Sequence, residues 1–172
     1  MITSSEISLP VSVLILTLNE EENIERCIGA LRWCEDIVVL DSLSTDGTVK
    51  KARNLGARIH ERKFDNFASQ RNYALEKIEF QHDWVLHLDA DEVVTDELVA
   101  EISEAVESDA FSAYRIPSRL IFQGKWLRHS GMYPVYQVRL GRKDKLKFDQ
   151  VGHGQRESLD PSSIGTLKNA YL

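Results

Sequence analysis

The chain has 172 residues, of which 42% are hydrophobic, and its formal net charge is −6. This length suits one globular domain with a buried core and leaves too little chain for two comfortable ones. The longest apolar run, residues 11–18, is well short of the roughly 20 residues that span a bilayer, and the first residues lack the basic flank and long apolar stretch of a secretory signal. We therefore expect a single cytoplasmic domain over residues 1–172, without a transmembrane helix or a nucleic-acid partner.

Positive charge is concentrated in residues 115–147, which hold nine Lys and Arg against one acidic residue, whereas residues 1–114 hold ten against 23. The basic residues are Arg115, Arg119, Lys125, Arg128, Arg139, Arg142, Lys143, Lys145 and Lys147. They could bind anionic lipid headgroups at a membrane surface or a phosphorylated ligand. A solvated surface without a ligand is the alternative.

The apolar pattern alternates between strand and helix. Residues 11–18 are typical of a strand covered on both faces, and Asn19 can cap a helix after it. Further strands are predicted at 37–40, 57–60 and 84–88, helices at 48–54, 67–78 (with Phe67 facing inward) and 96–106, and later strands at 113–122 and 136–140. This order predicts an α/β fold with a Rossmann-like, mostly parallel sheet, helices on both faces and a small antiparallel extension.

An apolar strand at residues 84–88 is followed by three carboxylates, Asp89, Asp91 and Glu92. If the strand persists to its tip, Asp89 and Asp91 share one face and can reach one cation. Hard oxygen ligands suit Mg²⁺ or Mn²⁺, and a sparse carboxylate site completes its coordination with water and substrate phosphates. The pattern therefore predicts a metal site that binds a diphosphate. The alternative is that these acids only begin the next helix.

Polar residues also follow the other predicted strands: Thr17, Asn19 and Glu20 follow the first strand and Asp41 follows the second. Because ligands of parallel sheets bind beyond the carboxyl ends of the strands, these side chains are candidates for ligand contacts. Asp41 could accept a hydrogen bond from a base or a ribose hydroxyl, or it could simply form a turn.

The chain contains no glycine-rich phosphate-binding loop, so a metal must carry more of the diphosphate charge. Arg71 and Asn72, expected on the exposed side of the third helix, could add contacts to phosphate. A salt bridge in solvent is the alternative.

Four motifs occur in the order and spacing of a known family. They are VSVLILTLNEEENI at 11–24, DSLSTDGT at 41–48, QRN at 70–72 and DAD at 89–91. Over about residues 9–171 the chain resembles a family 2 glycosyltransferase of the GT-A fold. Within that family it is most similar to lipopolysaccharide core biosynthesis glycosyltransferases of the WaaE/KdtX-like group, and residues 126–134 carry this narrower likeness.

The resemblance implies inverting, metal-dependent transfer of a sugar from a nucleotide-diphosphate sugar to a lipopolysaccharide-core or other surface-glycan acceptor, lipid-linked, at the cytoplasmic face of the membrane. Residues 1–112 would form the donor half and residues 113–172 the acceptor half. The implied contacts are Thr17, Asn19, Glu20 and Asp41 at the nucleoside, Arg71 at the phosphates, Asp89 at the ribose or the metal, and Asp91 at the metal, Mg²⁺ or Mn²⁺.

The inverting reaction needs a general base. Relatives usually show a compact Val-His-Glu, whereas residues 151–157 here read VGHGQRE, so His153 and Glu157 are candidates and Asp149 is a third. The chain ends at Leu172, where relatives usually continue. We therefore expect a shortened C-terminus, and the alternative function is a donor-binding module without independent transfer activity.

Overall fold

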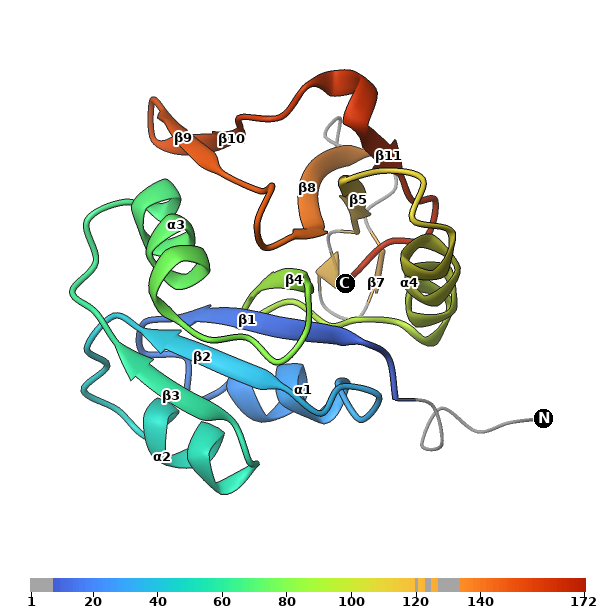
Figure 1. Ribbon diagram of the computed structural model, residues 1–172. Helices are drawn as coiled ribbons and strands as arrows, with labels where there is room; N and C mark the ends of the chain where they lie inside the picture. The colour runs from blue at the N-terminus through green and yellow to red at the C-terminus, as the bar shows by residue number, and fades with distance from the viewer. Residues whose placement is uncertain (1–7, 120, 123–124, 127–133) are drawn as a thin grey trace.

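A seven-stranded sheet organises the computed structural model, which describes residues 8–119, 121–122, 125–126 and 134–172. Its strand order is β11-β5-β8-β4-β1-β2-β3 (Figure 1). The strands are β1 (Val11–Thr17), β2 (Ile37–Asp41), β3 (Arg58–Glu61), β4 (Trp84–Asp89), β5 (Ala113–Ser118), β8 (Val135–Arg142) and β11 (Ile164–Thr166). The helices are α1 (Ile24–Gly29), α2 (Thr48–Asn54), α3 (Phe67–Lys77) and α4 (Asp96–Ser108).

The centre of the sheet is parallel, and β1 lies between β2 and β4. All seven residues of β1 are buried, which is why its sequence is almost continuously apolar. The antiparallel strand β8 inserts between β4 and β5. The predicted α/β class, its mostly parallel sheet and its antiparallel extension are therefore confirmed.

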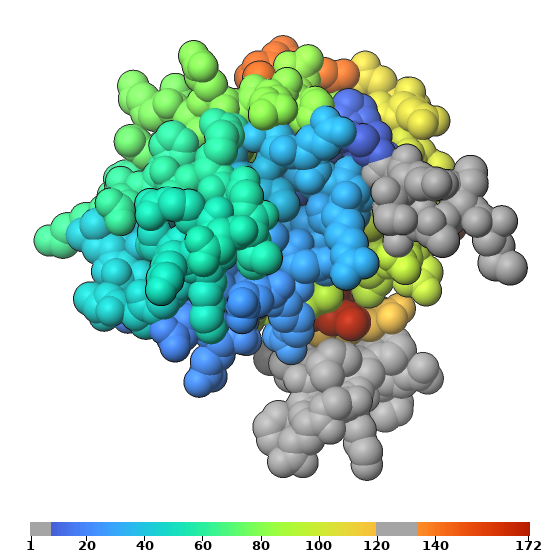
Figure 2. All heavy atoms as spheres, turned by 90° about the horizontal axis from the view of Figure 1, so that it is seen from below, coloured from blue at the N-terminus to red at the C-terminus, as the bar shows by residue number. Residues whose placement is uncertain are grey.

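Helices cover both faces of the sheet. The buried residues of α1 and α4, with Ala52 of α2, pack against one side of β1 and β4. On the other side, Ala74 of α3 packs with Leu14 and Leu16 of β1. Figure 1 shows α3 above the sheet with α1 and α2 below it, and Figure 2 shows α1 and α2 at the surface on that lower side. This arrangement confirms the prediction of helices on both faces.

Two helix details differ from the sequence analysis. The first helix begins at Ile24, not directly after Asn19, so the prediction that Asn19 caps it is wrong. Asn19 instead adopts a left-handed backbone with φ 55°, and its side chain accepts a hydrogen bond from the Thr45 amide at 2.9 Å. In α3, Phe67 is 42% exposed whereas Arg71 is buried. This is the reverse of the predicted burial, in which Phe67 faces inward and Arg71 is exposed.

A small hairpin of β9 (Phe148–Val151) and β10 (Gly154–Glu157) forms a sheet of its own. It lies over α3, to which both strands pack (Figure 1). The remaining elements are the short pair β6 (Ile121–Phe122) and β7 (Lys125–Trp126) and a 3₁₀ turn at Pro161–Ser163. Within the described ranges, none of the helices is both long and apolar enough to cross a membrane.

Candidate functional site

The carboxyl ends of three parallel strands meet at one edge of the sheet. Thr17 of β1 pairs in register with Asp41 of β2, and Leu16 pairs with Asp89 of β4. The polar residues predicted to cluster at this edge therefore do come together. Their arrangement follows from the parallel register, which aligns the last residues of neighbouring strands.

Two cavities open at this edge and share Phe67 and Asp89 in their walls. The first, here named the Thr17 cavity, has a volume of about 490 Å³. The second, here named the Arg71 cavity, has a volume of about 320 Å³. Polar residues in the wall of the Thr17 cavity include Thr17, Glu20, Ser42, Gln70 and Asp91, and those in the wall of the Arg71 cavity include Arg71, Tyr136, Arg139, His153, Gln155 and Glu157.

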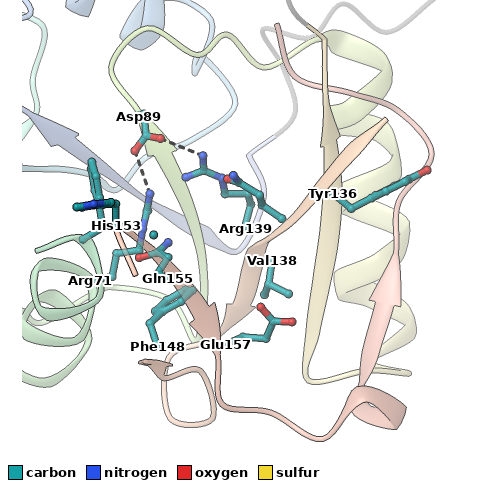
Figure 3. A pocket seen from close by; sticks show the side chains of 12 residues that line it. Arg71, Asp89, Tyr136, Val138, Arg139, Phe148, His153, Gln155 and Glu157 are labelled. Carbon is teal, nitrogen blue, oxygen red and sulfur yellow. Dashed lines mark hydrogen bonds and ion pairs between the residues drawn. The ribbon is translucent and has the colours of Figure 1, made fainter. Parts of the chain in front are cut away.

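Asp89, at the boundary between the cavities, is held by two arginines. Arg71 Nη2 donates to its Oδ1 and Arg139 Nη2 to its Oδ2, each at 2.9 Å (Figure 3). Burial alone would raise the pKa of Asp89, but the charges of Arg139 and Arg71 outweigh it and lower the pKa to about 2. Asp89 is therefore a carboxylate at neutral pH, and both of its oxygens have protein partners.

Glu92 completes a closed ring of contacts. Its Oε2 accepts the Asp89 backbone N–H at 2.8 Å, and its Oε1 accepts from Arg139 Nη2 at 2.7 Å. Burial raises the pKa of Glu92 to about 7, against the opposing charge of Arg139. The ring fixes the Asp89 carboxylate relative to its own backbone.

The sequence analysis did not recognise Arg139 as a site residue and grouped it with a basic surface. The structure buries it, with 3% exposure, in the middle of β8. The strand pattern did not signal this burial, because in a regular strand Val138 and Leu140 on either side would point to the face opposite to Arg139. A buried arginine needs acidic partners, which Asp89 and Glu92 supply.

The turn after β4 changes the interpretation of the DAD motif. Strand β4 ends at Asp89 and Asp91 lies in the turn, so the prediction that both share one strand face is wrong. The alternative, that these acids begin the next helix, is also wrong, because α4 begins at Asp96 and Thr95 caps it by accepting the Leu98 N–H. Asp91 is exposed and lines only the Thr17 cavity.

The described part of the chain holds no cluster of three or more His, Cys, Asp or Glu side chains suited to a metal. Both carboxylate oxygens of Asp89 are paired with arginines, so of the two aspartates in the DAD motif only Asp91 has a carboxylate that is exposed and available to a metal. Such a site still suits Mg²⁺ or Mn²⁺, because these ions often take one or two carboxylates and complete their shell with water and substrate phosphates. Metal binding by Asp89 stays a prediction.

The structure separates the four residues predicted at the nucleoside. Thr17 and Glu20 line the Thr17 cavity, whereas Asn19 and Asp41 do not. Asp41 is fully buried, and its carboxylate accepts from the Thr17 hydroxyl at 2.7 Å and from the Ser44 amide at 2.7 Å. Of the two interpretations of Asp41, the structure thus favours the turn, because its oxygens are already used to close the loop after β2.

Arg71 and Asn72 have different roles from those predicted on an exposed helix face. Burial and then the charge of Arg139 lower the pKa of Arg71 to about 10, which leaves it charged at neutral pH. The Asn72 amide donates to the Phe148 carbonyl at 2.7 Å and accepts from the Phe148 N–H at 2.9 Å. Asn72 therefore anchors the β9–β10 hairpin to α3, and its amide is not free for phosphate.

The three candidate bases lie on or beside this hairpin. His153 and Glu157 line the Arg71 cavity, and Figure 3 shows Glu157 near Val138, at the end away from Asp89. Asp149 lines neither cavity, and its carboxylate accepts from the Ser158 hydroxyl. The geometry retains His153 and Glu157 as candidates and disfavours Asp149.

The predicted basic surface of residues 115–147 is partly neutralised. Arg139 is buried, and Arg142 pairs with Asp109 at 2.6 Å. Lys143 and Lys145 lie 3.6 Å from Asp83 and Asp144 respectively. Arg128 and the side chain of Lys125 lie outside the described residues. The segment is thus less cationic at its surface than its composition indicates.

Comparison with known proteins gives the family. The model of glycosyl transferase family 2 matches residues 12–156. The chain belongs to this family. The match runs from the second residue of β1 into β10 and includes every residue that lines the two cavities except Glu157.

Curated relatives of this family 2 chain include the lipopolysaccharide core biosynthesis glycosyltransferase LpsC of Rhizobium meliloti. It is 31% identical over 95% of the chain and 62% of its own length. An uncharacterized glycosyltransferase of Rickettsia typhi is 35% identical over 66% of the chain and 40% of its own length. The chain thus spans between about two fifths and three fifths of these relatives.

Solved structures share the GT-A fold with this family 2 chain. Glucosyl-3-phosphoglycerate synthase of Mycobacterium tuberculosis, in complex with phosphoglyceric acid, superposes with a TM-score of 0.65 at 18% identity, over 95% of the chain and 70% of the other protein. S. aureus TarS 1–349, in complex with UDP-GlcNAc, superposes with a TM-score of 0.61 at 20% identity, over 94% of the chain and 57% of TarS 1–349. A complex of the mycobacterial synthase with Mn²⁺, UDP and glucosyl-3-phosphoglycerate superposes with a TM-score of 0.54 at 22% identity, over 67% of the chain and 46% of the synthase.

Proposed function

We propose that this chain is the catalytic part of an inverting, metal-dependent glycosyltransferase that moves a sugar from a nucleotide-diphosphate sugar to a lipopolysaccharide-core or other surface-glycan acceptor. The observation that carries the proposal is the position of Asp89 between two cavities. One of them contains the exposed Asp91, and the other contains both retained candidate bases. The likeness to LpsC supports the acceptor class.

The donor is proposed to bind in the Thr17 cavity. Its wall offers hydroxyl, amide and carboxylate groups from Thr17, Gln70 and Glu20, and Asp91 stands at the same wall. A divalent ion bound by Asp91 would stabilise the negative charge of the departing diphosphate. The complexes of structural neighbours with UDP-GlcNAc and with Mn²⁺ and UDP support a nucleotide donor and a divalent metal.

The acceptor is proposed to bind in the Arg71 cavity. Its hydroxyl oxygen attacks the anomeric carbon as the bond to the diphosphate oxygen breaks, and the hydroxyl proton passes to His153 or Glu157. Attack from the cavity opposite the leaving group inverts the configuration. The role of Asp89 is to present a fixed carboxylate at the junction of donor and acceptor.

A thermal-shift titration tests donor and metal together, because a ligand that binds only the native state raises its stability. We expect one nucleotide-sugar to stabilise the wild-type chain with Mn²⁺ or Mg²⁺ and to lose most of this effect after chelation. Asp91→Ala should remove the metal-dependent part while keeping the unliganded melting temperature. A metal-independent shift of equal size in both proteins would refute the role of Asp91.

Product formation then separates the candidate bases. With a defined acceptor, the transfer rate should fall at least about a hundredfold in either His153→Ala or Glu157→Gln, since a general base contributes about 10²–10⁴-fold. Asp149→Asn, at an exposed position outside both cavities, is the matched control and should keep its rate. Equal rates in all three variants would show that none of them is the base.

The alternative, a donor-binding module without transfer, predicts donor stabilisation with no product, and the comparisons give it no support.

Contact with an anionic membrane through residues 115–147, at the cytoplasmic face, also belongs to the proposal. Charge reversal at Lys145 and Lys147, both exposed, should reduce sedimentation with anionic vesicles. Unchanged sedimentation would remove membrane contact from the proposal.

A further inference from the structure

Two buried guanidinium groups at the Arg71 cavity lack part of their hydrogen bonding. Arg71 and Arg139 are 2% and 3% exposed, and each uses its Nη2 atom for Asp89. Among the described residues, the Nε and Nη1 atoms of both arginines have no hydrogen-bond partner. Buried polar groups in native proteins are almost always paired with protein, water or a ligand, so these four unpaired donor atoms are candidates for the acceptor oxygens of a ligand.

The planes of both guanidinium groups are fixed by aromatic rings. Arg71 lies over Phe148 with 6.0 Å to the ring centroid, and Arg139 lies over Tyr171 with 5.5 Å. Arg71 and Arg139 approach Asp89 from two sides in Figure 3. Such a pre-organised pair of planar forks matches the oxygens of a carboxylate or a phosphate.

The two cavities separate this pair from the proposed metal ligand. Arg71 and Arg139 line only the Arg71 cavity, and Asp91 lines only the Thr17 cavity. A diphosphate bound at Asp91 would therefore occupy the other side of Asp89. The two arginines that carry the unpaired donors share the wall of this cavity with His153 and Glu157, on the side where the acceptor is proposed to bind.

We propose that Arg71 and Arg139 form a site for an anionic group of the acceptor, a carboxylate or a phosphate, close to the hydroxyl that receives the sugar. This inference rests on the proposed function and narrows its acceptor class to acidic glycans. The cavity volume of about 320 Å³ suits one sugar unit that carries such a group. The arginines would orient the acceptor by its charge while the hairpin supplies the base.

Calorimetric titration of the full chain tests the site with methyl β-glucuronide, its uncharged methyl ester and inorganic phosphate, each with UDP and Mn²⁺ already saturating. We expect glucuronide to bind at least tenfold more tightly than the ester and phosphate to compete with it. Arg139→Lys should weaken glucuronide at least fivefold, because Lys keeps the charge but loses the planar fork. Arg71→Lys gives the same test if Arg139→Lys does not fold, and Lys50→Gln, at an exposed cation outside both cavities, should change nothing.

The outcomes separate this inference from the proposed function. If UDP binds and the ester binds as tightly as glucuronide, the anion site is refuted and the proposed function stands. If phosphate and UDP displace each other, the arginines serve the donor and the inference is wrong. If UDP with Mn²⁺ does not bind wild type, the proposed function fails, and a glucuronide preference lost in Arg139→Lys still demonstrates the anion site.

Discussion

Two acid–arginine groups lie at opposite edges of the same sheet. Asp36, just before β2, lies at the amino ends of the parallel strands and is 1% exposed. Its carboxylate accepts from the Ser12 hydroxyl at 2.6 Å, the Gln81 backbone N–H at 2.8 Å and Arg58 Nη2 at 2.7 Å. Asp89 lies at the carboxyl ends and is bound by two arginines.

The two groups differ in how completely their cations are satisfied. Arg58 reaches solvent, with 39% of its side chain exposed, and also donates to the Glu79 carbonyl. Arg71 and Arg139 are both buried and retain unpaired donors within the described chain. The network around Asp36 is complete and stabilises the fold. The network around Asp89 leaves donors unpaired, and these are the donors that we propose for a ligand.

The largest effect is expected for Arg71→Met. Transfer should fall at least about a hundredfold, or about 2.7 kcal/mol in the barrier. The free energy of unfolding should fall by less than the roughly 3–5 kcal/mol that follows when one partner of a buried ion pair is removed and the other charge is left unpaired, because Arg139 still pairs with Asp89. Initial rates and urea denaturation measure the two quantities. A rate per folded molecule that does not fall would refute the contrast between the two edges.

The opposite pattern is expected for Asp36→Asn at the other edge. Loss of hydrogen bonds to a charged group should lower the free energy of unfolding by about 1.5–3 kcal/mol. The rate per folded molecule should not change, since Asp36 lies at the amino ends of the strands, away from both cavities. Urea denaturation and rates corrected for the folded fraction check this, and a lowered corrected rate would contradict it.

Asn72, next to Arg71 in α3, has hydrogen-bond partners for its side-chain amide, so Asn72→Ala sharpens the comparison. Loss of both bonds to Phe148 should cost about 1–2 kcal/mol locally and loosen the β9–β10 hairpin. We expect faster amide exchange in residues 148–157 and about tenfold slower transfer, with UDP binding unchanged. Glu76→Ala, at an exposed position on the same helix, is the control. Unchanged exchange would show that Asn72 does not hold the hairpin.

The smallest effect is a pH dependence at Asp36. Burial alone would raise its pKa, but hydrogen bonds from Ser12, Gln81 and Arg58 outweigh it and lower the pKa below 3.8. The stabilisation is therefore fully present above about pH 4 and is lost as the pH falls through the lowered value. Urea midpoints of wild type should drop more between pH 6 and pH 3 than those of Asp36→Asn. Parallel drops would contradict the lowered pKa.

The sequence predicts the elements of this fold well where local pattern decides them. The helix at residues 48–54 has its predicted bounds, and β1 ends at Thr17, one residue before the predicted end. The prediction of the first helix start fails because Asn19 bonds to Thr45, a contact 26 residues away that local pattern does not encode. The strand ends correctly predict that Thr17, Asp41 and Asp89 meet, since parallel strands align their carboxyl ends.

The arginine pair could not be predicted from the sequence. Its geometry depends on β8 lying between β4 and β5, a strand order that hydrophobic periodicity does not specify. Arg71 lies four residues after Phe67, on the same side of the helix, yet Arg71 is buried and Phe67 is 42% exposed, so the helical period alone does not decide their burial. Long-range pairing therefore determines which charged residues meet, while local pattern determines only which strands and helices carry them.

The separate sheet formed by the β9–β10 hairpin has an evolutionary consequence. Its backbone ladder is independent of the seven-stranded sheet, and Asn72 bonds to the hairpin through backbone atoms of Phe148. Substitutions at residues 149–156 other than the candidate base His153 can therefore accumulate without disturbing the central fold. This ribbon is where we expect natural relatives to diversify and where directed evolution of new glycan products has the greatest freedom.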